Sequence, residues 1–399
     1  MRKWFFLLAV LCYTFTYAQK PLSVQMAESQ HNLQEYWDGA SGLIAYALTS
    51  VSAQYPEESI AQEWAKIYLD RVLDENGVPI DYQKGVLEQM LPGKALINLY
   101  KQTQDEKYKK AFNWLHTYLV MNYPRIKKNT GKTGFLHEDA YPNQMWLQDL
   151  YDGCSFYAQW LAACDEKNKA GWTDIAVQFI TLDKQAYNKI LGLTYPHWSA
   201  DPGNENSFWA NRGGIYSGTS KVFTGQSTGY LLAALTEVLE AMPKNQAGYN
   251  QLHDILQHVA EGVQNWQDES GCWYQLIAFN SEKQSSCGIS NYLESTASAL
   301  LTYGLLKGVR TGLLDAAKYG PTAEKAYEGL VKQFVTEEGG VLTLKDASGY
   351  IGIGNGAEMG RDGSEDYYLC GEDVEKCDND PKAVAAFILA TLEHEKALK

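Results

Sequence analysis

Apolar residues recur three and four positions apart along most of this chain, which is the spacing of amphipathic helices. The stretches that carry this pattern are 35–53, 58–74, 88–103, 105–122, 145–164, 171–190, 224–241, 247–266, 292–311, 315–334 and 381–397. The pattern predicts eleven helices, the last of them capped by Asn379 or Asp380 with Pro381 in its first turn. Segments 271–277 and 340–344 are typical of short strands within loops.

The loops between these helices alternate in length. Position 104 and segment 312–314 are short connections, whereas four loops are long: 123–144, 191–223, 267–291 and 335–380. Tight turns at one end and long loops at the other predict helical hairpins set in a closed ring, with the long loops gathered over one mouth. We therefore predict an all-α fold whose functional residues lie at that mouth.

The N-terminus has the features of an export signal. Arg2 and Lys3 precede an apolar run that ends with Thr16 and Ala18, so residues 1–18 are predicted to be a signal peptide and the mature protein to be periplasmic or secreted. Residues 19–399 contain no linker-like composition and are predicted to form a single domain. No further apolar run is long enough to predict a membrane span.

Six cysteines remain after the predicted cleavage, in a compartment that permits disulfides. Cys370 and Cys377 lie seven apart in a loop, and Cys272 and Cys287 flank a polar turn, so each pair could form a disulfide. Cys154 and Cys164 would lie on one helix, about 15 Å apart along its axis, which is too far for a disulfide.

Charge and motifs exclude several functions. The formal net charge is −14 and no basic stripe interrupts it, which argues against nucleic acid as a partner. His253 and His258 have no third ligand in a zinc-binding spacing, and the glycines of 352–363 follow no strand of a βαβ unit. We predict neither a metal nor any other cofactor.

The segment 141–151, YPNQMWLQDLY, carries the strongest chemical signal. A helix is predicted to begin at about Met145, and His137 and two carboxylates lie shortly upstream. An aromatic platform beside carboxyl and amide groups is typical of a sugar site. The structural alternative is that Trp146 and Tyr151 belong to the core and Asp149 is a capping or solvated carboxylate, because a chain with 11 Trp and 27 Tyr must bury most of them.

Four collinear blocks resemble the unsaturated rhamnogalacturonyl hydrolases of glycoside hydrolase family 105. They are GKALINLYKQTQDEKY from Gly93, the segment 134–151, Trp273 to Gln275 with NYLESTASALLTYGLLKGVRTGLLD from Asn291, and RDGSEDYY from Arg361 followed by NDPKAVAAFILA from Asn379. The resemblance implies an (α/α)6 barrel. It also implies a substrate, the unsaturated uronic acid at the end of an acidic oligosaccharide, and a reaction in which a carboxylic acid protonates the C4=C5 double bond and water adds at C5.

The resemblance transfers to the site only in part. The catalytic Asp of the family's W-L-D-G-L-Y motif corresponds to Gln148, and Asp149 is the next residue. The second family carboxylate, before a P-G-K run, corresponds to Glu88. We therefore predict Asp149 and Glu88 as the catalytic carboxyl groups.

In the family's W-G-R-G-N-G-W pattern, Thr224 stands for the first Trp and Gln226 for the Arg. The residues predicted to bind substrate are His137, Trp146, Gln148, His197, Gln226 and Tyr230. These differences from the family pattern leave three functions open: hydrolysis of an unsaturated uronide, hydrolysis of another, saturated sugar, and glycan binding without catalysis. In each of them the partner is an oligosaccharide, and the net charge favours a short acidic one.

Overall fold

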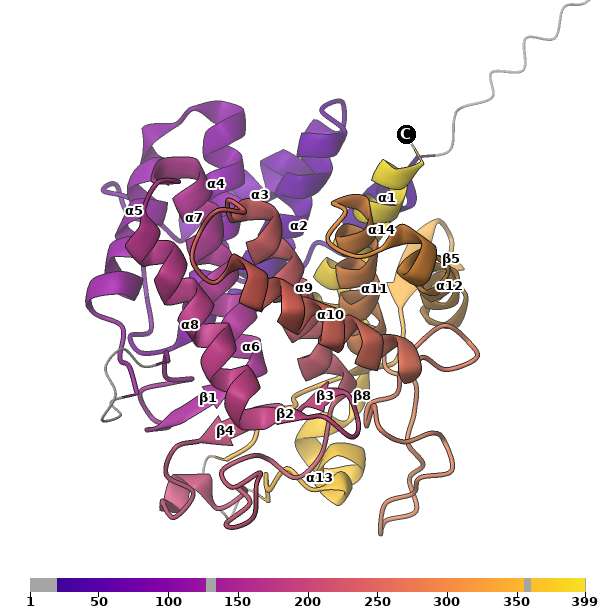
Figure 1. The fold of residues 1–399 in the computed structure, drawn as a ribbon. Helices are drawn as coiled ribbons and strands as arrows, with labels where there is room; N and C mark the ends of the chain where they lie inside the picture. Colours follow the sequence, from indigo (N-terminus) through magenta and orange to yellow (C-terminus); the bar gives the residue numbers. More distant parts are fainter. Residues whose placement is uncertain (1–19, 127–133, 355–359, 399) are drawn as a thin grey trace, which may run out of the picture.

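The computed structural model describes residues 20–126, 134–354 and 360–398, so the predicted signal peptide lies outside the described residues. Two concentric layers of helices make up most of the molecule (Figure 1). The inner layer consists of α2 (Gly39–Gln54), α4 (Pro92–Thr103), α7 (Phe156–Cys164), α9 (Gly225–Ala241), α11 (Ser295–Arg310) and α14 (Pro381–Ala397). The outer layer consists of α1 (Leu22–Ser29), α3 (Ser59–Arg71), α5 (Glu106–Met121), α8 (Lys169–Ala186), α10 (Tyr249–Asn265) and α12 (Ala316–Phe334).

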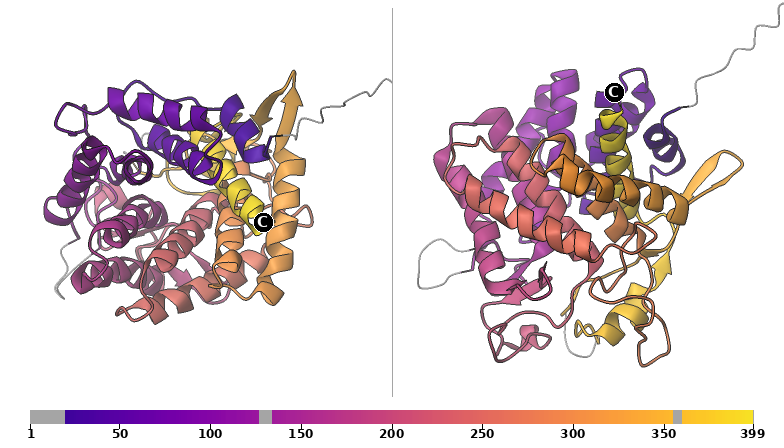
Figure 2. Two further views of the ribbon diagram at one scale, coloured as in Figure 1. Left: turned by 90° about the horizontal axis from the view of Figure 1, so that it is seen from above. Right: turned by 45° about the vertical axis from the view of Figure 1, so that its right-hand side comes forward.

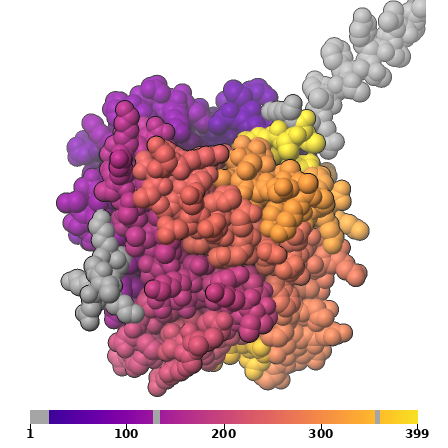
Figure 3. Space-filling view, viewed as in Figure 1, coloured from indigo at the N-terminus to yellow at the C-terminus, as the bar shows by residue number. Residues whose placement is uncertain are grey.

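The inner helices close a ring. Each contacts the next, from α2 through α4, α7, α9, α11 and α14 back to α2, and each carries one outer helix on its far side. Seen from above, the helices surround a common centre (Figure 2, left). In the space-filling view, the outer helices α8 and α10 lie across the front of the molecule (Figure 3). The predicted all-α (α/α)6 barrel is therefore present.

Small residues allow the inner helices to approach closely. Almost every residue of α9 and α11 is buried, whereas α10 and α12 bury one face. A Cβ atom at Gly229 would lie 2.6 Å from Leu300, and one at Gly304 would lie 2.6 Å from Leu232, so these glycines set the contact between α9 and α11. Hydrophobic burial along this ring supplies most of the driving force for the fold.

The predicted helices are present, with differences at their ends and two additions. Asp380 caps α14 by accepting hydrogen bonds from the backbone of Lys382 and Ala383, and Pro381 is its first residue, as predicted. The pattern missed α1 and a short helix α13 (Glu365–Cys370), both of which have one or two turns. Short helices depend on tertiary packing, here α1 against α14, more than on their own pattern.

The long loops gather at one end of the barrel, the lower end in Figure 1. Three short strand pairs lie at this end: β1 (Gln144–Trp146) with β4 (His197–Ser199), β2 (Tyr187–Asn188) with β3 (Leu193–Thr194), and β7 (Ala347–Ser348) with β8 (Lys376–Cys377). A fourth pair, β5 (Val335–Glu338) with β6 (Val341–Leu344), lies instead beside α12 and α1. The connecting segments also contain three short 3-10 turns, η1 (Leu87–Met90), η3 (Glu205–Ser207) and η5 (Glu372–Val374). We call this end of the barrel, with its loops, the mouth.

A disulfide joins two of the mouth loops. Cys287 pairs with Cys370, with their Cα atoms 6.6 Å apart, so both predicted pairings, Cys370 with Cys377 and Cys272 with Cys287, are wrong. The sequence favoured partners close along the chain, whereas folding brings together two loops separated by 83 residues. Cys154 and Cys164 are unpaired, as their spacing predicted.

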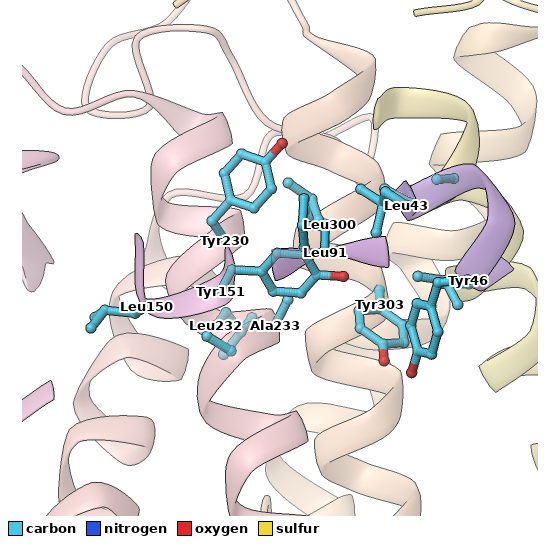
Figure 4. Packing of buried hydrophobic residues seen from close by; sticks show 14 of the residues in the cluster. Leu43, Tyr46, Leu91, Leu150, Tyr151, Tyr230, Leu232, Ala233, Leu300 and Tyr303 are labelled. Carbon is cyan, nitrogen blue, oxygen red and sulfur yellow. The ribbon is translucent and has the colours of Figure 1, made fainter. Parts of the chain in front are cut away.

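A charged pair lies inside the ring. Lys94 Nζ lies 2.7 Å from a carboxylate oxygen of Glu237, with both side chains almost fully buried. The ammonium also lies 4.2 Å from the ring centroids of Tyr46 and Tyr151, and the hydroxyl of Tyr303 donates to Glu237. The three tyrosines converge near the centre of the barrel (Figure 4). Across the described residues, no helix is long and apolar enough to cross a membrane.

Candidate active site

The segment from Trp146 to Ser155 positions the central side chains of the mouth. The predicted helix start at Met145 is wrong, because residues 144–146 form strand β1, whose Trp146 pairs with His197 of β4. The chain turns into α6 (Leu147–Asp149) only after Trp146, continues as a π-helical turn η2 (Leu150–Ser155), and then becomes α7. Wide turns of this kind inside helices are often found at functional sites.

Asp149 closes the start of this helix. Its Oδ2 accepts a hydrogen bond of 2.7 Å from the backbone N–H of Trp146, which caps the first turn. Its Oδ1 lies 2.7 Å from Nδ1 of His137. Both carboxylate oxygens are thus engaged, and the side chain is buried. These contacts favour a structural and positioning role for Asp149.

Asp152 lies one turn further along the same face. Its Oδ2 accepts a hydrogen bond of 3.2 Å from Nε2 of Gln148, while its Oδ1 is buried without a hydrogen-bond partner among the described residues. Only 1% of the residue is exposed. Burial raises the pKa of Asp152 well above its ordinary value, the negative charge of Glu88 raises it further, and the ammonium of Lys382 opposes the shift. Asp152 is therefore a carboxyl group that favours its protonated form.

Glu88 comes from the turn η1, which packs against the helical turn η2. Its side chain packs against Gly39, where a Cβ atom would lie 2.0 Å from the Glu88 Cγ, so this position requires glycine. Its Oε2 accepts a hydrogen bond of 3.3 Å from Nζ of Lys382, the second residue of α14. The Glu88 side chain remains 32% exposed. Glu88 is thus an accessible carboxylate paired with a cation.

His137 and Trp146 form an aromatic stack beside these carboxyl groups. Their ring centroids lie 3.4 Å apart and the planes differ by 8°. Tyr141 leans against both rings, and His197 meets Trp146 edge-on at 4.5 Å. Burial, together with His137, lowers the pKa of His197 well below its ordinary value, so this imidazole is neutral. Trp146 and His197 are almost completely buried, and His137 presents only part of its ring.

Glu138 completes the group. A bridge between Val86 and Glu138 brings the loop of His137 next to the turn that carries Glu88. Burial raises the pKa of Glu138, the charges of Asp149 and Glu88 add to the rise, and His137 opposes it. Glu88 is therefore close enough to both Glu138 and Asp152 for its charge to act on them, so carboxyl groups from three separate segments share one region of the mouth.

The structure brings most of the predicted site residues into this region. His137, Trp146, Gln148, Asp149 and His197 belong to the joined segments at the mouth, and Glu88 faces them. Gln226 and Tyr230 lie one turn apart on α9, both buried. Tyr230 is close enough to Lys382 and Asp152 for their charges to affect its pKa, which burial raises. The predicted roles of all these residues stay predictions.

Sequence reasoning missed Asp152, Glu138 and Lys382 as site residues. Glu138 adjoins His137 and could have been found there. Asp152 stands four residues after Gln148, the spacing that places two side chains on one helix face, so this signal was also present. Nothing in the sequence indicates that Lys382, 294 residues from Glu88, would pair with it.

Comparison with known proteins agrees with this architecture. The pattern of Glycosyl Hydrolase Family 88 matches residues 17–398. A family 105 glycoside hydrolase from C. acetobutylicum ATCC 824 is 30% identical, with a TM-score of 0.84 over 94% of this chain and 100% of that one. The chain belongs to the glycoside hydrolases of families 88 and 105.

Two further relatives of this glycoside hydrolase are more distant. An unsaturated 3S-rhamnoglycuronyl hydrolase from Alteromonas sp. (strain LOR) is 25% identical over 120 residues, which is 30% of this chain and 27% of that protein. An unsaturated glucuronyl hydrolase from Bacillus sp. GL1 shares the fold, with a TM-score of 0.61 at 13% identity over 94% of this chain and 95% of that one. The family implies an oligosaccharide substrate for this hydrolase.

Proposed function

We propose that this glycoside hydrolase removes the terminal unsaturated uronic acid from short acidic oligosaccharides produced by polysaccharide lyases. The observation that carries the proposal is that Glu88 lies within electrostatic range of both Glu138 and Asp152, in the same part of the mouth as the stacked rings of His137 and Trp146. A hydration reaction needs one carboxyl group that holds a proton at neutral pH and an environment that places the sugar ring against it. The names of two relatives, an unsaturated rhamnoglycuronyl and an unsaturated glucuronyl hydrolase, point to the same substrate class.

In the proposed reaction the glycosidic bond is not attacked first. A carboxylic acid protonates C4 of the C4=C5 enol ether, and water adds at C5 to give a hemiketal that opens and releases the remaining oligosaccharide. A carboxylate near the ring stabilises the positive charge that develops at C5. Glu88, accessible and paired with Lys382, is suited to that second role.

We also propose that the mature protein works outside the cytoplasm. The positively charged, then apolar N-terminus and the disulfide between Cys287 and Cys370 both support export. Mass spectrometry of the protein recovered from the periplasm or medium of its host would test this, with a new N-terminus near Gln19 as the expected result.

The function is tested with lyase digests of several acidic polysaccharides, followed by the ultraviolet absorbance of the conjugated double bond. The expected result is loss of that absorbance together with release of the shortened oligosaccharide. Matched oligosaccharides with a saturated terminal uronide serve as controls and should remain intact. Cleavage of the saturated controls with the chromophore untouched would indicate a different glycosidase, and binding of a sugar without any product would indicate a glycan-binding protein.

A further inference from the structure

We propose that Asp152 is the proton donor of this enzyme. It lies one helical turn beyond Gln148, the position that corresponds to the family's catalytic aspartate. This inference rests on the proposed function, because it names the acid of that reaction. It stands on three observations: the place of Asp152 on the helix, the state of its two oxygens and the groups that surround it.

The helix places Asp152 and Gln148 on one face. They are four residues apart, and the hydrogen bond from Gln148 to Asp152 Oδ2 shows that both side chains point the same way. Tyr151 points instead toward Lys94 and Tyr46 inside the barrel. The π-helical turn that begins at Leu150 contains Asp152, so the wide part of the helix and the carboxyl group coincide.

The two oxygens of Asp152 are unequal. Oδ2 receives the amide hydrogen of Gln148, while Oδ1 is buried and no group in residues 20–126, 134–354 and 360–398 hydrogen-bonds to it. A buried carboxylate oxygen that accepts no hydrogen bond from a protein group costs free energy, because burial removes its hydration. Such a cost persists where the group has a task, and a protonated Oδ1 would present an O–H donor to a bound ligand.

The charged and titratable groups that face Asp152 come from several elements. They are Glu88 of η1, Asp149 of α6, Lys382 of α14, Tyr230 of α9, Tyr151 of η2 and Lys94 of α4. Burial, Glu88 and Asp149 raise the pKa of Asp152, and Lys382 lowers it. This combination favours the protonated form of Asp152, while the more exposed Glu88 is paired with Lys382.

The reaction balances with Asp152 alone as acid and base. The C4=C5 electron pair takes the proton from Asp152 and forms the new C4–H bond, which leaves positive charge on C5 and the ring oxygen. A water molecule forms the C5–O bond, and its released proton returns to the Asp152 carboxylate. The net change is addition of one water, and the acid is regenerated.

The other carboxyl groups at the mouth are less suited to this step. Asp149 has both oxygens engaged, by the N–H of Trp146 and by His137. Glu88 is 32% exposed and accepts a hydrogen bond from Lys382. Glu138 remains 31% exposed on its side chain, beside His137. Asp152 is the most deeply buried of the four.

The first experiment compares kcat of the parent, Asp152→Asn and Asp174→Asn on the lyase product that the parent cleaves. Asp174 is a matched control, a buried aspartate on the outer wall paired with Arg125. We expect Asp152→Asn to lose a factor of about 10² to 10⁴ in kcat, the usual contribution of a general acid, and Asp174→Asn to keep it. If the parent is active and Asp152→Asn retains more than about a tenth of its kcat, the inference fails while the proposed function stands. If the parent cleaves no uronide, both fail.

A second measurement separates a missing proton donor from a misfolded protein. In the folded state Asp152 holds its proton more tightly than in the unfolded chain, so its ionisation opposes folding once the pH exceeds the ordinary Asp value of about 3.9. Asp152→Asn should therefore have an equal or higher Tm than the parent at neutral pH, with the difference shrinking toward pH 4. Asp174→Asn should have a lower Tm. A large loss of Tm in Asp152→Asn would assign Asp152 a structural role and overturn the inference.

A third measurement uses Lys382. Because its ammonium lowers the pKa of Asp152, Lys382→Met should move the alkaline limb of the kcat profile to higher pH, whatever happens to the absolute rate. Lys376→Met, an exposed lysine paired with Asp346, is the control and should leave the limb in place. An unchanged limb in Lys382→Met would contradict Asp152 as the titrating acid.

Discussion

Nε2 of Gln148 donates a hydrogen bond of 3.2 Å to Oδ2 of Asp152, which joins an amide at the start of a helix to a buried carboxyl group one turn later. The resemblance to family 105 places the expected catalytic aspartate at Gln148, so this chain has an amide where a carboxyl group was expected. The carboxyl group of Asp152 lies next to that amide along the helix face. The amide can hold Asp152 in one orientation, but it cannot itself protonate carbon.

Replacing Gln148 by Asp tests which of the two positions carries the acid. If Asp152 is the donor, Gln148→Asp should lower kcat by about tenfold or more, because two adjacent carboxyl groups share one proton and the orienting amide is lost. Gln148→Leu, which removes the hydrogen bond without adding a charge, is the matched variant and should lower kcat less. A rise in kcat for Gln148→Asp would show that position 148 remains the natural place for the acid.

Asp149 offers a comparison between a cap and an acid. Asp149→Ala removes the acceptor for the Trp146 N–H and the partner of His137, and should cost about 1–2 kcal/mol of stability. Asp149→Asn keeps an acceptor oxygen for that N–H, so it should recover most of the loss. The amide of the Asp149→Asn variant would donate to Nδ1 of His137, so the proton of the neutral imidazole would move to Nε2. Because His137 is a predicted substrate-binding residue, we expect this change to raise KM more than it lowers kcat. Denaturant unfolding and steady-state kinetics measure both effects. A loss of kcat in Asp149→Asn as large as that in Asp152→Asn would make Asp149 the acid instead.

The disulfide between Cys287 and Cys370 ties α13 to the loop 267–291. Two nearby contacts lie between the same segments: Lys283 with Glu365, and the backbone of Ser286 with Asp366. Reduction should lower the stability of the parent by about 2–4 kcal/mol, as for other disulfides that close long loops. The double variant Cys287→Ser/Cys370→Ser should have the same stability as the reduced parent, and reductant should not change it. Peptide mapping that links Cys370 to Cys377 would contradict this pairing.

Two histidines should make the protein sensitive to acid. Burial lowers the pKa of His197 well below its ordinary value, and it lowers the pKa of His116, stacked on Trp160, to about 4. Histidine in the unfolded chain has a pKa of about 6.5, so below that pH the unfolded chain takes up protons that the folded state does not. The free energy of unfolding therefore falls as the pH drops from about 6.5 toward 4. In Tm measurements across this range, His197→Asn should show a shallower decline than the parent. Equal declines would mean that His197 is not held neutral.

The helical hairpins were predictable from sequence because each helix repeats the same apolar period over three or more turns. The start of α6 was not, because Met145 and Trp146 continue an apolar helical pattern and yet pair with Trp198 and His197 in a strand. That pairing forms between segments about fifty residues apart, so no local pattern records it. The choice between Gln148, Asp149 and Asp152 has the same origin, since it depends on the π-helical turn and on what surrounds each carboxyl group.

By itself, the sequence determined an all-α protein, the cap at Asp380, the long loops at one mouth and the family to which the chain belongs, because periodicity, turn residues and motif spacing are local or collinear properties. Only the tertiary structure decided that Lys382 pairs with Glu88, that the Glu88 charge acts on Glu138 and Asp152, and that Cys287 pairs with Cys370. The physical reason is that ionisation, desolvation and cross-linking depend on distance in space, and closing the helical ring brings together residues that lie far apart along the chain.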